Sequence, residues 1–114
     1  MKIPKTIKIS HYNYSIIETN DEEILDGNWG LIDYGQEVIY IRKELTHANK
    51  QTCLLHEILH GVFHMNRNNV MLFPSVKKEK DLEHHFIFGV EETLMSVIKD
   101  NPKVMEYLQS KGDK

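Results

Sequence analysis

The chain has 114 residues, and its 14 Lys and Arg residues against 17 Asp and Glu residues give a formal net charge of -3. This length fits one domain, which we expect to span residues 1–110 before a short tail at 111–114. The mildly acidic balance argues against a nucleic-acid-binding domain, and no stretch reaches the roughly 18 apolar residues of a membrane span. The chain opens without an apolar signal segment, and its single cysteine cannot form an internal disulfide. We therefore expect a small cytoplasmic protein that binds neither nucleic acid nor membranes.

The N-terminal part of the chain has the patterns of β-strands. Four segments carry the alternating or β-branched pattern, and these are residues 5–10, 14–18, 28–34 and 37–43. An acidic segment at 20–28 is typical of a loop. Gly35 separates the last two strand segments and can supply the positive φ of a hairpin turn. We expect a small, mostly antiparallel sheet of three or four strands.

Helical periodicity begins at residue 46. Three helices are expected, and they span residues 46–65, 79–100 and 102–109. Thr46 is a suitable N-cap for the first helix and Asn101 for the third, which would begin with Pro102. The segment 66–78 contains Asn-Asn and Phe-Pro-Ser and is predicted to be a loop. The expected fold is therefore α+β, with the sheet packed against the first helix.

The first of these helices contains the motif His56-Glu57-Ile58-Leu59-His60, an H-E-x-x-H sequence. Residues i and i+4 lie one turn apart on the same helix face, so His56 and His60 can bind one zinc ion through bonds of about 2.0–2.1 Å. Glu57 lies beside them and can accept a proton from a water molecule that the zinc ion activates. This arrangement is typical of zinc peptidases. The motif therefore predicts a zinc site with Glu57 as the general base.

The rest of this helix supports a site on one face. Six apolar residues should cover about half of its circumference, and these are Leu54, Leu55, Ile58, Leu59, Val62 and Phe63. His56, Glu57 and His60 fall together on the opposite arc. The alternative is a pair of structural histidines on an amphipathic helix that binds no metal.

A catalytic zinc ion usually has three protein ligands, and the second long helix is the expected source of the third. On that helix Glu91 and His84 fall inside the apolar arc centred on Val90, where a polar side chain needs a partner. Glu91 is the first choice and His84 the second. Either residue could instead lie at the boundary of the core and form hydrogen bonds with the sheet.

Other residues are weaker candidates for the site. Glu92 and His85 fall closer to the solvent side of the second helix. His64 lies eight residues after His56, a rise of about 12 Å along a helix, so the two cannot share one ion. Cys53 lies on the same face as His56 and could neighbour the metal, although a small residue that fills space is the simpler interpretation. Three aromatic residues are expected to pack on the sheet, and these are Trp29, Tyr34 and Tyr40.

The stretch GNWGLIDYGQEVIYIRKELTHANKQTCLLHEILHGVF, residues 27–63, resembles the ImmA/IrrE-like metallopeptidase family, in particular its short members from phages and mobile elements. The ending VIKDNPKVMEYL, residues 97–108, is similar to the C-terminal part of short phage members. The resemblance implies a zincin-like core, in which a second helix donates an acidic ligand to a zinc site on the first.

For individual residues, the resemblance implies that His56 and His60 bind zinc and that Glu57 is the general base. The family's acidic ligand lies in the second helix. Alignment on the shared Asp-Asn-Pro ending places Phe88 near that position, so this chain departs from the family pattern there. Glu91 is then a shifted candidate for the acidic ligand.

Two functions follow from these observations. The first is a zinc-dependent metallopeptidase of phage or mobile-element origin that hydrolyses a protein or peptide substrate, since family members cleave regulatory proteins such as phage repressors. Its substrate could add as a strand to an exposed edge of the sheet, for which residues 37–43 are the expected edge strand. The second is a catalytically degenerate zincin-like protein, in which the metal stabilises a protein-interaction module.

Overall fold

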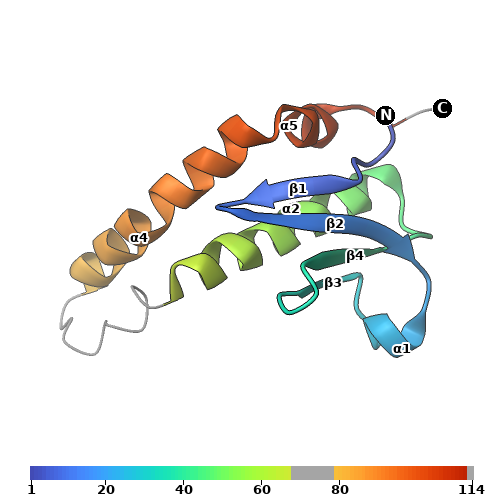
Figure 1. The fold of residues 1–114 in the computed structure, drawn as a ribbon, viewed down its shortest axis with the longest axis horizontal. Coiled ribbons are helices and arrows are strands. Elements are labelled where there is room, and N and C mark those ends of the chain that lie inside the picture. Colours follow the sequence, from blue (N-terminus) through green and yellow to red (C-terminus); the bar gives the residue numbers. More distant parts are fainter. Residues whose placement is uncertain (68–78, 113–114) are drawn as a thin grey trace.

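The computed structural model describes residues 1–67 and 79–112 (Figure 1). It has the expected α+β architecture, and its elements are β1 (Thr6–Ile9), β2 (Tyr12–Thr19), α1 (Glu22–Leu25), β3 (Gly30–Asp33), β4 (Val38–Arg42), α2 (His47–Met65), α4 (Glu79–Asp100) and α5 (Pro102–Gln109). The predicted loop at 66–78 lies, from residue 68 onward, outside the described residues. None of the helices in the described ranges is long and apolar enough to cross a membrane.

The four strands form one mixed sheet in the order β1-β2-β4-β3. The β1–β2 and β3–β4 pairs are antiparallel, as two hairpins require, whereas β2 and β4 run parallel. The parallel pair arises because the connection through α1 carries the chain past the position of β4, and the second hairpin then returns β4 between β2 and β3 (Figure 1). The prediction of an edge strand at residues 37–43 is therefore wrong. β4 is internal, and β3 is the edge strand on that side of the sheet.

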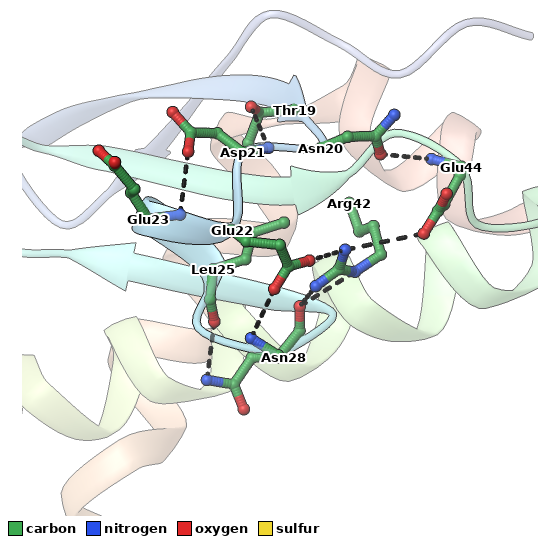
Figure 2. Close-up of polar contacts among 10 residues, drawn as sticks. Thr19, Asn20, Asp21, Glu22, Glu23, Leu25, Asn28, Arg42 and Glu44 are labelled. Atoms are coloured by element: carbon green, nitrogen blue, oxygen red, sulfur yellow. Dashed lines mark hydrogen bonds and ion pairs between the residues drawn. The ribbon is translucent and has the colours of Figure 1, made fainter.

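The acidic segment at 20–28 contains the short helix α1, where the sequence predicts only a loop. Asp21 caps this helix, because its side chain accepts a hydrogen bond from the backbone N–H of Glu23 at 2.9 Å (Figure 2). Glu22 and Glu23 lie in the first turn, where negative charge is favourable to the helix dipole. The chain leaves the helix through Asp26, whose φ of 50° is left-handed. The acidic residues thus stabilise a helix start.

α2 has the bounds that the sequence predicts, from His47 to Met65. Its N-cap is Thr46, whose side chain accepts a hydrogen bond from the backbone N–H of Asn49 at 3.2 Å. The helix lies across one face of the sheet and contacts β1, β3 and β4 (Figure 1). This placement positions the H-E-x-x-H motif beside the β3 edge.

The core lies between α2 and the sheet. Four residues of α2 belong to this core, and these are Cys53, Leu54, Ile58 and Val62. The sheet contributes mostly isoleucines, namely Ile7, Ile9, Ile16, Ile32, Ile39 and Ile41. The apolar face of α2 is wider than the surface that the sheet covers, because Leu55, Leu59 and Phe63 are exposed.

α4 and α5 also have the predicted bounds, and Asn101 lies at their junction. Its side chain does not cap α5, contrary to the sequence-based expectation. Instead Oδ1 accepts a hydrogen bond from the Lys8 backbone N–H at 2.7 Å, and Nδ2 donates to the Lys8 carbonyl oxygen at 2.7 Å and to that of Val97 at 2.8 Å. These hydrogen bonds attach the α4–α5 junction to β1.

Candidate metal centre

The side chains of His56 and His60 converge on the outer face of α2. Their Nε2 atoms are 3.0 Å apart, and the rings meet edge to face with centroids 4.6 Å apart. Both residues are exposed. Two zinc–nitrogen bonds of about 2.0–2.1 Å at a tetrahedral angle place the nitrogen atoms about 3.3 Å apart. The pair therefore fits two positions of one zinc ion after a small adjustment of the rings.

Glu57 points in a different direction from the two histidines. It is only 5% exposed, so the prediction that it shares their solvent-facing arc is wrong. A turn of about 100° per residue places Glu57 on the flank of α2 that faces β3, where a Cβ on Gly30 would lie 3.4 Å from Glu57 Oε2. Burial raises the pKa of the Glu57 carboxyl, and the neighbouring His56 and His60 oppose this effect. A carboxyl with a raised pKa is suited to accept and return a proton.

A small pocket opens between α2 and the start of β3. Its volume is about 220 Å³, and it is lined by Asn28, Trp29, Gly30, Thr52, Cys53, His56 and Glu57. Trp29 is 48% exposed and supplies an aromatic wall. Only glycine fits at position 30, because a Cβ would lie 2.5 Å from Cys53 Sγ and 2.8 Å from the Tyr40 carbonyl oxygen. The close approach of β3 to α2 thus forms a pocket that contains both His56 and Glu57.

Cys53 is buried in the wall of this pocket. Burial raises the pKa of its thiol to about 11, and the charge of Glu57 contributes a smaller part of this increase. The thiol is therefore protonated at neutral pH and is a poor nucleophile there. This agrees with the interpretation of Cys53 as a small residue that fills space.

Polar contacts position the loop that carries Asn28 and Trp29 (Figure 2). Arg42 of β4 donates through Nη2 to the Asn28 carbonyl oxygen at 2.9 Å and forms an ion pair with Glu22. Glu22 also accepts a hydrogen bond from the backbone N–H of Gly27 at 2.9 Å. The hydrogen bond from Arg42 lowers the pKa of the Glu22 carboxyl. The rim of the pocket is therefore held by α1 and β4.

Tyr34 follows β3 and contacts α2 near the second histidine. Its hydroxyl donates to the His60 carbonyl oxygen at 3.2 Å, and its ring stacks on His64 with centroids 3.7 Å apart. Burial raises the pKa of the Tyr34 hydroxyl, and the charge of Glu57 adds a smaller increase. Burial also lowers the pKa of His64. Tyr34 and Trp29 therefore flank the two ends of β3 beside the motif, although the sequence predicts only sheet packing for both.

α4 contacts α2 beyond the motif. The Phe86 ring lies 5.6 Å from the Phe63 ring, and Asn66 Nδ2 donates to Thr93 Oγ1 at 3.0 Å. Phe63 and Asn66, which form these contacts from α2 and its C-cap, both follow His60 in the chain. α4 thus meets the C-terminal end of α2, one to two turns from the histidine pair.

The structure does not bring the predicted third ligands to that pair. Glu91 and His84 are exposed, so the prediction that they face the core is wrong. Glu92 is exposed as expected, whereas the side chain of His85 lies outside the described part of the chain. The helical-wheel argument fails because several apolar residues of α4 are exposed rather than buried, namely Phe86, Ile87, Phe88, Met95 and Ile98.

The side chains that the structure describes do not assemble a complete set of zinc ligands. Among them, with those of residues 79–82 and His85 left aside, no group of three or more His, Cys, Asp or Glu side chains is arranged to hold a metal ion. His56 and His60 supply two nitrogen donors of the type that zinc prefers. The donor pair fits two ligand positions of a zinc ion, and the described side chains supply no third ligand beside it.

The sequence predicts no site role for four residues of the pocket, namely Asn28, Trp29, Gly30 and Thr52, nor for Tyr34, which contacts α2 at His60. Gly30 carries the one local signal that points to the pocket. An isolated glycine inside a strand often marks a position where another backbone or side chain approaches closely. Its neighbours Trp29 and Tyr34 contribute through the packing of β3 against α2, which depends on tertiary structure.

Comparison of the chain with models of protein families, with curated proteins and with solved structures finds no match. The geometry of the site therefore carries the functional argument.

Proposed function

We propose that the chain is a zinc-dependent peptidase of phage or mobile-element origin, with a zincin-like core of the ImmA/IrrE-like kind, that hydrolyses a protein substrate. The observation that carries this proposal is the 3.0 Å separation between the Nε2 atoms of His56 and His60, with the buried Glu57 beside them. When bound, zinc supplies Lewis-acid activation of a water molecule and of the substrate carbonyl group. His56 and His60 would hold the ion.

Glu57 is the general base in this proposal. Its carboxylate takes a proton from the attacking water and returns it to the leaving amine. Burial against β3 favours the protonated carboxyl, whereas His56 and His60 favour the carboxylate. These opposing effects support a role in which Glu57 passes between both forms during one turnover.

The substrate backbone is proposed to lie along β3, the edge strand beside the motif. The backbone N–H of Arg42 donates to the Trp29 carbonyl oxygen at 2.7 Å. Because backbone groups alternate along an antiparallel strand, the N–H and C=O groups of Gly30 and Ile32 then point away from β4. An extended substrate could pair with them and bring its scissile bond past Glu57.

Amide hydrogen exchange tests this placement of the substrate. In the Glu57→Gln variant with a substrate peptide bound, exchange at Gly30 and Ile32 should slow. Leu31 and Asp33 are internal controls, because their backbone groups already face β4 and should change little. Unchanged exchange at Gly30 and Ile32 in a bound complex would exclude strand addition at this edge.

Glu91 is our proposal for the third zinc ligand. This proposal requires a movement of α4 towards the histidine pair. In the structure α4 contacts α2 beyond the motif, at Phe63 and Asn66. A Glu91→Gln variant should bind zinc more than about 10–100-fold more weakly than the wild type in a chelator competition assay, because loss of a hydrogen-bonded partner of a ligand alone already costs that much. Glu92→Gln is the matched control, since Glu92 is the adjacent glutamate on α4 and is exposed as well. Equal affinities in both variants would remove Glu91 from the site.

The Glu57→Gln variant tests the enzymatic function. We expect the zinc-loaded wild type to cleave components of a mixed peptide library, as detected by mass spectrometry. Glu57→Gln should lower the cleavage rate by about 10²–10⁴-fold while it retains zinc, because only the proton acceptor is lost. Glu92→Gln should cleave like the wild type. Cleavage that survives in Glu57→Gln would contradict the proposed mechanism.

One observation favours a second function, a catalytically degenerate zincin-like interaction module. Exposed apolar residues adjoin the histidine pair, and His56, Leu59, His60 and Phe63 line an open hollow of about 440 Å³. Such a surface is typical of a protein-binding site. A module of this kind would bind zinc but cleave nothing in the peptide library, and Glu57→Gln would leave its partner binding unchanged.

A further inference from the structure

A separate cavity lies at the start of α2, away from the H-E-x-x-H motif. Its volume is about 590 Å³, and it is lined by Met1, Lys2, Ile3, Lys5, Ile16, Glu18, Lys43, His47, Lys50 and Tyr107. It shares no lining residue with the two hollows at the motif. Small-molecule sites commonly have volumes of about 300–1,000 Å³. The cavity is therefore of a size that admits a small molecule.

The charge of this cavity is opposite to that of the whole chain, whose formal net charge is -3. Four lysines line it, and Glu18 is the one acidic residue among its described lining residues. Lys50 Nζ pairs with Glu18 at 2.6 Å. The ammonium groups of Lys2, Lys5 and Lys43 thus have no acidic partner in the lining. Positive charge gathered around one hollow favours an anionic ligand.

Tyr107 provides an independent observation at the same cavity. The residue is only 1% exposed, and its ring packs edge-on against His47 with centroids 5.3 Å apart. Its backbone carbonyl accepts hydrogen bonds, for example from Gln51 Nε2 at 2.8 Å, but its hydroxyl has no hydrogen-bond partner in residues 1–67 and 79–112. Within these ranges no fully buried side-chain oxygen or nitrogen lacks a partner. Tyr107 is also a lining residue of the cavity, and a phenolic hydroxyl is able to donate a hydrogen bond to an anionic ligand.

The remaining lining is suited to the uncharged part of a ligand. Ile3 and Ile16 supply apolar surface, and His47 is the first residue of the 19-residue helix α2. The partial positive charge of a helix N-terminus adds to the field of the lysines. We propose that this cavity binds a small phosphorylated molecule with an apolar or aromatic body, such as a nucleoside diphosphate. The phosphates of this ligand would contact the lysines and the Tyr107 hydroxyl. The apolar or aromatic body of the ligand would contact Ile3 and Ile16.

NMR titration of the full chain tests this proposal, with ADP and inorganic pyrophosphate as probes at about 150 mM salt to screen weak surface binding. We expect saturable amide shifts that are confined to residues 1–5, 43–50 and the neighbourhood of Tyr107. ADP should bind more tightly than pyrophosphate, because it also contacts the apolar lining. Pyrophosphate binding as tight as that of ADP would overturn the part of the proposal that concerns the ligand body.

Charge-reversal variants locate the site. The double variant Lys5→Glu/Lys43→Glu should weaken ADP binding at least about tenfold, because two attractive contacts become repulsive. The control Lys99→Glu/Lys103→Glu changes the net charge equally at exposed positions outside this cavity and should change the affinity less than about twofold. Equal losses in both double variants would show that binding reflects net charge alone and would overturn the proposal.

Tyr107→Phe removes only the hydroxyl and should weaken ADP binding severalfold without loss of the dispersed NMR spectrum. The absence of saturable shifts with ADP up to millimolar concentrations would also overturn the proposal. So would preferential binding of a single-stranded oligonucleotide, with shifts at these residues that ADP does not produce.

Discussion

The hydroxyl of Tyr34 donates a hydrogen bond to the backbone carbonyl of His60 at 3.2 Å, while the Tyr34 ring stacks on His64. One residue at the end of β3 thus fixes the edge of the sheet against the helix turn that carries the second histidine. At the other end of β3, Gly30 permits close contact with Cys53 and Glu57. The candidate metal centre therefore depends on how β3 packs along α2 as well as on the motif itself.

Substitution of Tyr34 separates its two contacts. Tyr34→Phe keeps the stacking on His64 and should lower the free energy of unfolding by about 0.5–1.5 kcal/mol, the contribution of one hydrogen bond. Tyr34→Ala also loses the ring contact with His64, so it should lower the free energy of unfolding more than Tyr34→Phe does. It should also weaken zinc binding, because the turn that carries His60 is then no longer held by Tyr34. Urea denaturation and chelator competition measure the two effects. A Tyr34→Ala variant with wild-type stability and zinc affinity would show that Tyr34 does not position the helix.

Gly30→Ala tests the close approach of β3 to α2. The added Cβ would lie 2.5 Å from Cys53 Sγ and 2.8 Å from the Tyr40 carbonyl oxygen. We expect a loss of about 1–3 kcal/mol in the free energy of unfolding, as for overpacking in a core. Gly35→Ala is the control, because its Cβ would make only an ordinary contact at 3.5 Å with Asp33 Oδ1. Similar thermal denaturation midpoints for the two variants would contradict this packing.

Cys53 should show a strong dependence on pH. Its thiol pKa is about 11 in the folded chain against an ordinary value of 9.0. Because the folded pKa is raised, the contribution of the thiol to stability is complete below about pH 9 and is lost as pH rises towards 11. At pH 8 the folded chain should react with a thiol reagent about 90-fold more slowly than the urea-unfolded chain, from the smaller thiolate fraction alone. Equal rates would mean that Cys53 is accessible and ionised normally.

Asn101 links two parts of the chain that are distant in sequence. Loss of its side chain in Asn101→Ala leaves the Lys8 N–H and two carbonyl oxygens without their partner. We expect a decrease of about 2–4 kcal/mol in the free energy of unfolding. Asn13→Ala, at an exposed position opposite Lys8 in the sheet, should cost less than about 0.5 kcal/mol. If denaturant unfolding gave the two variants the same stability, the junction at Asn101 would not stabilise the fold.

The features that the sequence predicts well are local ones. The bounds of α2, α4 and α5 follow from periodicity, the N-cap at Thr46 and the proline at 102. The convergence of His56 and His60 follows from the rise and rotation of a single helix. These features depend on residues that are close together in the chain.

The features that sequence analysis misses depend on packing between elements. The position of β4 inside the sheet follows from the path of the chain through α1, and β4 has the same strand pattern at an edge or in the interior. Glu57 is buried because β3 lies against that flank of α2. A helical wheel that assumes one buried face places Glu91 towards the core, whereas α4 exposes several of its apolar residues. Asn101 has the sequence context of a cap, yet its side chain contacts β1.

The zinc content of the native protein tests the central claim most directly. Native mass spectrometry should find about one zinc ion per wild-type chain, and His56→Ala and His60→Ala should each lose it. His11→Ala is the control, since His11 is exposed at the β1–β2 turn and should leave the zinc content unchanged. Absence of zinc from the wild type after incubation with the metal, or the same zinc content in His56→Ala, would contradict a metal centre at the motif.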